Sequence, residues 1–136
     1  MSDPSPIHIS PEFEERLATS GQEFLADFLR RGSRRNPGNL VALSALAQVL
    51  TQLGRIREGL EADQRLAALA PKDAMVHYNL ACSLCLLERN QEALDALEKS
   101  IDLGYDDLPH MLQDEDLMGL NEERRFQELA KRLGDQ

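Results

Sequence analysis

Apolar residues between positions 40 and 69 fall into two stripes, each with the spacing of one face of an α-helix. The first follows an i, i+3, i+4, i+7 pattern and comprises Leu43, Leu46, Ala47 and Leu50. The second comprises Ile56, Gly59, Leu60, Leu66 and Ala67. Gly54 permits a sharp turn between the two stripes, and Pro71 cannot continue a helix beyond them. The pattern predicts two helices that fold back on each other.

The same pattern recurs 34 residues later, because residues 74–107 align with residues 40–73. Ten positions are identical, and most are apolar, as expected for two copies of one packing unit. The identities are Leu46/Leu80, Ala47/Ala81, Leu50/Leu84, Leu53/Leu87, Arg55/Arg89, Glu58/Glu92, Leu60/Leu94, Ala62/Ala96, Leu69/Leu103 and Asp73/Asp107. The residues that we expect in the core include Leu46, Leu80, Leu84, Leu94 and Leu97.

Helices are also predicted on both sides of the repeats. Ser10 before Pro11 is typical of a helix start, and an apolar stripe follows up to Gly32. A capping-box pattern at residues 20–23 would start a second helix, so this segment is either two helices or one bent helix. After the repeats we expect one or two short helical turns over residues 107–120. A last helix, capped by Asn121, then presents an apolar face comprising Phe126, Leu129, Ala130 and Leu133.

These residues carry a family resemblance. The spacing of Leu46-Ala47, Leu50, Gly54, Gly59 and Pro71 resembles the tetratricopeptide repeat (TPR), and residues 78–104 match it best. Residues 101–133 are similar to an end-of-array segment of some bacterial TPR proteins. The resemblance implies an all-α fold, an α-solenoid of antiparallel helix pairs with capping helices at both ends. Three residues depart from the family pattern, since Asp63 replaces a large apolar residue, Glu88 a glycine and Tyr105 a proline.

The domain organisation follows from these segments. We expect a disordered tail over residues 1–10 and a single TPR-like domain over residues 11–133, because 136 residues suit one core. The domain is predicted to contain a degenerate N-terminal helical unit (11–35), two repeats (40–73 and 74–107) and capping helices (108–133). Two repeats alone are marginally stable, so the capping helices should cover the apolar ends of the array.

Composition excludes several classes of function. The net charge is −9 and aromatic residues make up 4%, both of which argue against a nucleic-acid-binding surface. No apolar stretch approaches the roughly 20 residues of a membrane helix, and the first residues lack the pattern of a secretory signal. Cys82 and Cys85 cannot form a disulfide framework, so we expect a reducing, cytoplasmic location.

Catalytic motifs are not found, and we expect no enzyme, no catalytic residue and no cofactor. Cys82 and Cys85 form a C-x-x-C pattern in the middle of a predicted helix, whereas a redox pair needs an electropositive helix start and a zinc site needs two more ligands. We interpret them as small packed residues. The acidic residues between positions 106 and 116 are interpreted as a solvated loop with helix caps, so no metal site is expected.

The resemblance also implies where a partner binds. In TPR proteins the first helix of each pair lines a concave surface, and the corresponding residues here are Val41, Ser44, Ala45, Gln48, Gln52, Met75, Tyr78, Asn79, Cys82 and Leu86. Asn79 matches a family position that often bonds the backbone of a bound peptide, and an amide can both donate and accept. The basic residues of the family's carboxylate clamp are replaced by Ser44, Gln48 and Cys82. We therefore expect no carboxylate clamp.

The predicted function is a non-enzymatic scaffold that binds a peptide or helix of another protein in this concave groove. Two alternatives stay open, a small acidic secretion-type chaperone and a self-associating assembly module. The second is suggested by charge asymmetry, since residues 1–73 contain 10 acidic and 9 basic residues and residues 74–136 contain 14 and 6. Weak homo-oligomerisation is therefore expected alongside a protein partner, with no nucleic-acid or membrane partner.

Overall fold

The structure, a computed structural model that describes residues 9–136, contains only helices, turns and connecting loops over that range. The predicted all-α fold is confirmed. The helices are α1 (Pro11–Arg35), α2 (Leu40–Gln52), α3 (Ile56–Leu69), α4 (Ala74–Leu86), α5 (Asn90–Asp102), α6 (Leu108–Gln113), the short 3₁₀ helix η1 (Glu115–Leu120) and α7 (Arg124–Gly134). None of the helices within residues 9–136 combines the length and the apolar character needed to span a bilayer.

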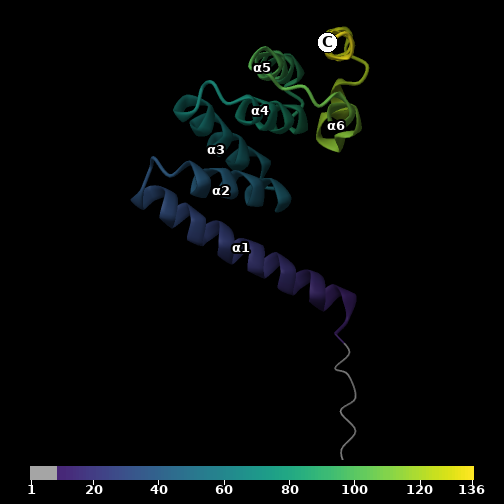
Figure 1. Ribbon diagram of the computed structural model, residues 1–136. Coiled ribbons are helices and arrows are strands. Elements are labelled where there is room, and N and C mark those ends of the chain that lie inside the picture. Colours follow the sequence, from purple (N-terminus) through teal and green to yellow (C-terminus); the bar gives the residue numbers. More distant parts are fainter. Residues whose placement is uncertain (1–8) are drawn as a thin grey trace, which may run out of the picture.

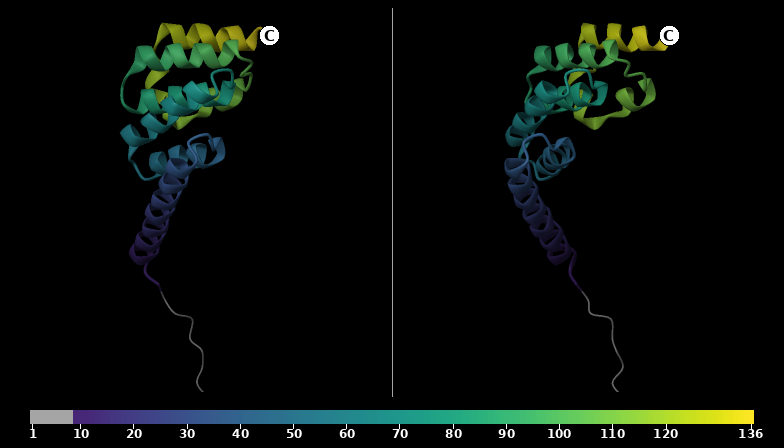
Figure 2. Two further views of the ribbon diagram at one scale, coloured as in Figure 1. Left: turned by 90° about the vertical axis from the view of Figure 1, so that its left-hand side faces the viewer. Right: turned by 60° about the vertical axis from the view of Figure 1, so that its left-hand side comes forward.

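Successive helix pairs stack on one another, as the resemblance implies for an α-solenoid (Figure 1). The α2–α3 pair packs through α3 on the α4–α5 pair, and the α6–η1 segment with α7 closes the C-terminal end. Helix α1 lies against α2 at its C-terminal half and projects away from the stack at its N-terminal half (Figure 2). The α6–η1 segment lies beside α4, so α2, α4 and α6–η1 succeed one another along one side of the stack.

The core consists of two clusters that correspond to the predicted apolar stripes. One lies between α1, α2 and α3 and includes Leu43, Leu46 and Leu50, while the larger one joins both pairs to the C-terminal helices. Of the five leucines expected in the core, Leu46, Leu84, Leu94 and Leu97 are buried. Leu80 is only partly buried and packs at the margin of the larger cluster.

The second helix of each pair starts in the same way. Arg55 and Arg89 occupy the N-cap positions of α3 and α5 but make no side-chain capping bond there. Each arginine instead pairs with the glutamate three residues on, at 2.5 Å for Arg55–Glu58 and 2.7 Å for Arg89–Glu92. The resulting ion pair lowers the pKa of each glutamate. The identities Arg55/Arg89 and Glu58/Glu92 are thus explained by a shared way of starting a helix and not by core packing.

The tight turns inside the two pairs have equivalent geometry but different residues. Gly54 follows α2 with φ 78°, and Glu88, 34 residues later, follows α4 with φ 59°. In both turns the next residue's N–H donates to a carbonyl oxygen in the last turn of the preceding helix, Arg55 to Leu50 and Arg89 to Leu84. A left-handed conformation suits glycine and strains a residue with a Cβ. Glu88 is therefore the less favourable residue for this turn.

Replacing Glu88 with glycine is expected to stabilise the protein by roughly 0.5–1 kcal/mol, because the relief of left-handed strain exceeds the entropy that glycine adds to the unfolded chain. Urea denaturation followed by circular dichroism measures the shift as a higher midpoint. The reciprocal variant Gly54→Glu is the matched control and should lower the midpoint. An unchanged or lower midpoint for Glu88→Gly would show that the turn is not strained.

Several predicted boundaries differ from the observed ones. The N-terminal segment is one continuous helix, so the capping-box pattern at residues 20–23 starts no helix, and α1 passes Gly32 to end at Arg35. Ser10 caps α1 as predicted, its Oγ accepting from the Phe13 N–H at 3.2 Å. The last helix begins at Arg124, because Asn121 ends η1 instead of capping α7. Of the tail predicted over residues 1–10, residues 1–8 lie outside the described part.

Candidate functional site

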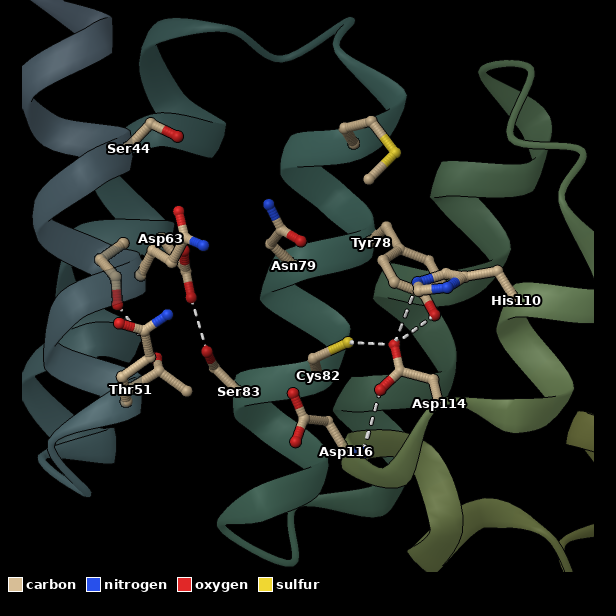
Figure 3. Close-up of a pocket in the computed structure, with 14 residues that line it drawn as sticks. Ser44, Thr51, Asp63, Tyr78, Asn79, Cys82, Ser83, His110, Asp114 and Asp116 are labelled. Carbon is tan, nitrogen blue, oxygen red and sulfur yellow. Dashed lines mark hydrogen bonds and ion pairs between the residues drawn. The ribbon is translucent and has the colours of Figure 1, made fainter.

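A hollow of about 380 Å³ opens on the side of the stack formed by α2, α4 and α6–η1. Each of these segments contributes polar side chains to it, and Asp63 of α3 lies at its base (Figure 3). An adjoining hollow of about 400 Å³ lies between α2, the end of α3 and the start of α4. The two hollows share Ser44 and Gln48. They differ in chemistry, since the second hollow is lined mainly by apolar side chains.

Most of the ten residues predicted for the concave groove line one of these hollows. The first hollow contains Ser44, Gln48, Gln52, Met75, Tyr78, Asn79 and Cys82. The second contains Val41 and Ala45 together with the shared Ser44 and Gln48. Leu86 lines neither, because it lies at the C-terminal end of α4, where its side chain is partly exposed.

Tyr78 and Cys82 are buried in the seam between α4 and α6–η1, so they are not open to a partner in this structure. The Tyr78 ring stacks on Tyr105, with ring centroids 4.4 Å apart. Tyr105 is the residue that replaces the family's proline, and its hydroxyl donates to the Asp107 carbonyl oxygen at 3.0 Å. The aromatic stack thus anchors the segment that follows α5 onto α4. The open part of the predicted groove is correspondingly shorter.

Asp114 is the main polar contact in this seam. Its Oδ2 accepts hydrogen bonds from the Tyr78 hydroxyl at 2.6 Å and from the Cys82 thiol at 3.7 Å (Figure 3). Its Oδ1 accepts from the Asp116 N–H at 3.0 Å and so caps η1. The His110 Nε2 lies 3.5 Å from Oδ2. The carboxylate therefore holds α6 and η1 against the side of α4 that carries Tyr78 and Cys82.

Three groups that could ligate a metal ion converge here, since the candidate ligand atoms of Cys82, Asp114 and Asp116 all lie within 4.8 Å of one another. A metal at this position would have to displace the hydrogen bonds to Asp114 and remove the Cys82 proton. Burial and the neighbouring Asp114 raise the pKa of the Cys82 thiol, and burial raises the pKa of Cys85. Both free thiols are therefore held protonated, which makes them poor nucleophiles.

Asp63 is a buried carboxyl group at the base of the hollow. The Ser83 hydroxyl donates to its Oδ2 at 2.5 Å, which links α3 to α4 across the boundary between the two repeats. Burial raises the pKa of Asp63 to about 6, and the Ser83 bond opposes part of that rise. The equivalent residue of the second repeat is Leu97, which is fully buried. The first repeat thus places a titratable group where the second has core packing.

The acidic and basic side chains that line the first hollow are three carboxyl groups and one histidine, His110. The carboxyl groups are those of Asp63, Asp114 and Asp116, and neither lysine nor arginine lines the hollow. Low-dielectric walls strengthen the field of such groups, so a positively charged or hydrogen-bond-donating group is favoured inside. This agrees with the absence of the carboxylate-clamp residues noted in the sequence.

The sequence analysis missed the residues that α6–η1 adds to this wall. The sequence pattern assigns Asp114 and Asp116 to a solvated loop with helix caps and gives His110 no role. The capping role of Asp114 is present, but its side chain also faces α4. Asp114 lies 36 residues from Tyr78, a separation at which no helical periodicity carries information. The 34-residue repeat could have predicted this contact. Adding 34 to the residue numbers of α4 gives residues 108–120, which is the segment that lies beside α4 in the structure.

The described helices form an all-α solenoid with a TPR-like fold. The crystal structure of MamA, a TPR-type protein, is similar to this chain with a TM-score of 0.70 at 17% sequence identity, over 93% of this chain and 74% of that of MamA. Among curated proteins, a chloroplastic protein of Arabidopsis thaliana is 29% identical over 85 residues. That match covers 60% of this chain but 25% of the relative, so the chain spans about a quarter of its length. No family model matches the chain.

Proposed function

We propose that the protein is a non-enzymatic scaffold that binds a polypeptide segment of a partner protein on the side formed by α2, α4 and α6–η1. The observation that carries the proposal is the pair of adjoining hollows along this side, which share Ser44 and Gln48. Asn79, whose side chain is exposed beside them, supplies an amide for a peptide backbone. The TPR-like fold supports a role in protein interaction in general.

The chemistry of the two hollows indicates which residues the partner segment should contain. The first offers three carboxyl groups, and the second offers apolar side chains that include Leu40, Val41 and Val76. A segment with a lysine or arginine next to a medium-sized apolar residue would satisfy both. Because the wall is already formed by packed helices, binding would order the partner and not the scaffold, which reduces the entropic cost.

A role without catalysis is supported by the state of the cysteines. A protonated, buried thiol is not an activated nucleophile, and the residues around Cys82 raise its pKa instead of lowering it. Free cysteines also suit a reducing compartment, so we propose a cytoplasmic location. The secretion-type chaperone alternative stays a prediction.

Peptide selection by phage display, followed by fluorescence anisotropy with the synthetic peptides, tests this proposal. We expect the selected sequences to share a basic residue beside an apolar one. The Gln48→Arg variant places a positive charge and a longer side chain between the two hollows, so its affinity should fall at least about tenfold, or about 1.4 kcal/mol. The matched control is Gln64→Arg, because Gln64 is exposed on α3 and lines neither hollow.

The proposal fails if the selected peptides bind Gln48→Arg and wild type equally, with the fold of the variant intact by circular dichroism. It also fails if acidic peptides dominate the selection, since the field of the first hollow would oppose them. An equal loss for Gln64→Arg would place the binding surface on the other side of the stack.

A further inference from the structure

Helix α1 carries large apolar side chains that nothing in the described chain covers. The exposed fractions are 51% for Phe13, 53% for Leu17, 74% for Phe24 and 63% for Phe28. Every residue from 11 to 20 is exposed, because this half of the helix projects beyond the stack (Figure 2). Four such residues on one helix exceed the scattered exposed apolar side chains of an ordinary soluble surface.

The four side chains form one stripe. With 3.6 residues per turn, their spacing places them on the face of α1 opposite to Ala26, Leu29 and Ser33, which pack toward α2. Ser20 and Gly21 fall between Leu17 and Phe24 on the same side, where their small size permits a close approach of a second helix. The stripe therefore has the form of a helix–helix interface and not of a core face.

The projecting half of α1 also lacks tertiary packing, which supplies most of the stability of helices in proteins. Residues 11–20 make no such packing in the described chain. A second helix along the stripe would supply it.

The charges of α1 indicate what that second helix is. Residues 11–23 contain four acidic residues and one basic residue, whereas residues 24–35 contain four basic residues and one acidic residue. Two copies of α1 that run antiparallel bring each acidic half beside a basic half, while a parallel arrangement brings like charges together. Arg34 and Arg35 make no ion pair within residues 9–136.

We propose that α1 is a dimerisation helix that pairs antiparallel with α1 of a second copy. The stripe is symmetric about Ser20 and Gly21, so Phe13 of one copy lies opposite Phe28 of the other, and Leu17 opposite Phe24. Every large side chain of the stripe then meets another one. This interface involves a different face from the concave wall, so its test is independent of the proposed peptide binding.

Light scattering coupled to size-exclusion chromatography, from about 1 μM to about 1 mM protein, tests the pairing. The mass of the wild type should rise from 15.3 kDa to twice that value, and high salt should shift the rise to higher concentration. The double variant Phe24→Glu, Phe28→Glu should stay at 15.3 kDa. Leu112→Glu is the matched control, because Leu112 is 52% exposed on α6 and lines neither hollow, and this variant should dimerise as the wild type does.

Cysteine cross-linking tests the orientation. Ser20→Cys lies at the crossing point and should form a disulfide between copies, since the native cysteines are buried. Phe13→Cys should not, because the two copies of residue 13 would be roughly 20 Å apart along the pair. A wild type that stays monomeric throughout overturns the proposal and leaves the stripe to a different protein. Efficient cross-linking of Phe13→Cys with itself overturns the antiparallel arrangement.

Discussion

Replacing Phe126, Leu129 and Leu133 together with alanine is expected to unfold the whole domain, although all three residues lie in the last helix. Each side chain is buried in the larger core cluster, which also contains Leu94 and Leu97 of the second repeat. A large-to-small change in a core costs about 2–5 kcal/mol. Three such changes approach or exceed the roughly 5–15 kcal/mol that a domain of this kind has in total.

The opposite face of α7 provides a matched control for this prediction. Arg124, Gln127 and Glu128 are exposed, so their joint replacement with alanine should leave the melting temperature within a few degrees of the wild type. Circular dichroism during heating measures both variants. If the apolar-face variant melts cooperatively near the wild-type temperature, α7 is not the cap of the array.

The Asp63→Asn variant is expected to be more stable than the wild type at pH 8 and similar to it at pH 4. Folding raises the pKa of Asp63 from the ordinary value of 3.8 to about 6 because the carboxyl group is buried. Between these two values the folded protein binds a proton that the unfolded chain has lost. The wild type therefore loses stability as the pH rises through this range, by up to roughly 3 kcal/mol from this residue.

Asparagine keeps the shape of the side chain and can still accept the Ser83 hydrogen bond without carrying a charge. Urea denaturation of both proteins at several pH values from 4 to 8 isolates the contribution of Asp63, because the other carboxyl groups are common to both. Glu61→Gln removes an exposed charge from the same helix and should change stability little at any pH. A wild-type-minus-variant difference that is constant with pH would mean that Asp63 is not titrating within the fold.

The helices of the two repeats could be predicted because each has a local apolar period. Leu43, Leu46 and Leu50 are buried because their spacing places them on one face of α2. The α1 segment could not be settled in the same way, since the capping-box residues at 20–23 compete with a continuous helix and the sequence does not show which prevails. The burial of Leu80 was predicted too high. Leu80 is equivalent to the buried Leu46 in the repeat, but the helices around it cover it less completely.

The candidate site was predictable on α2 and at Asn79 of α4, but not at the two α4 positions that α6–η1 covers. Ser44, Gln48 and Asn79 stay exposed where the repeat pattern places them. Tyr78 and Cys82 occupy the equivalent face of α4, but the α6–η1 segment covers them through Asp114. The α6–η1 segment has no strong helical periodicity of apolar residues. Its position on α4 is therefore set by tertiary packing and not by a local sequence pattern.

Nuclear magnetic resonance with a selected basic–apolar peptide tests the concave wall most directly. On titration of the ¹⁵N-labelled protein, the largest chemical-shift changes should fall on the amides of Ser44, Gln48 and Asn79, with smaller changes at Asp114. Largest changes on the outer stripe of α1, on α5 or on α7, with those three amides unmoved, would contradict the account that the side formed by α2, α4 and α6–η1 receives the partner.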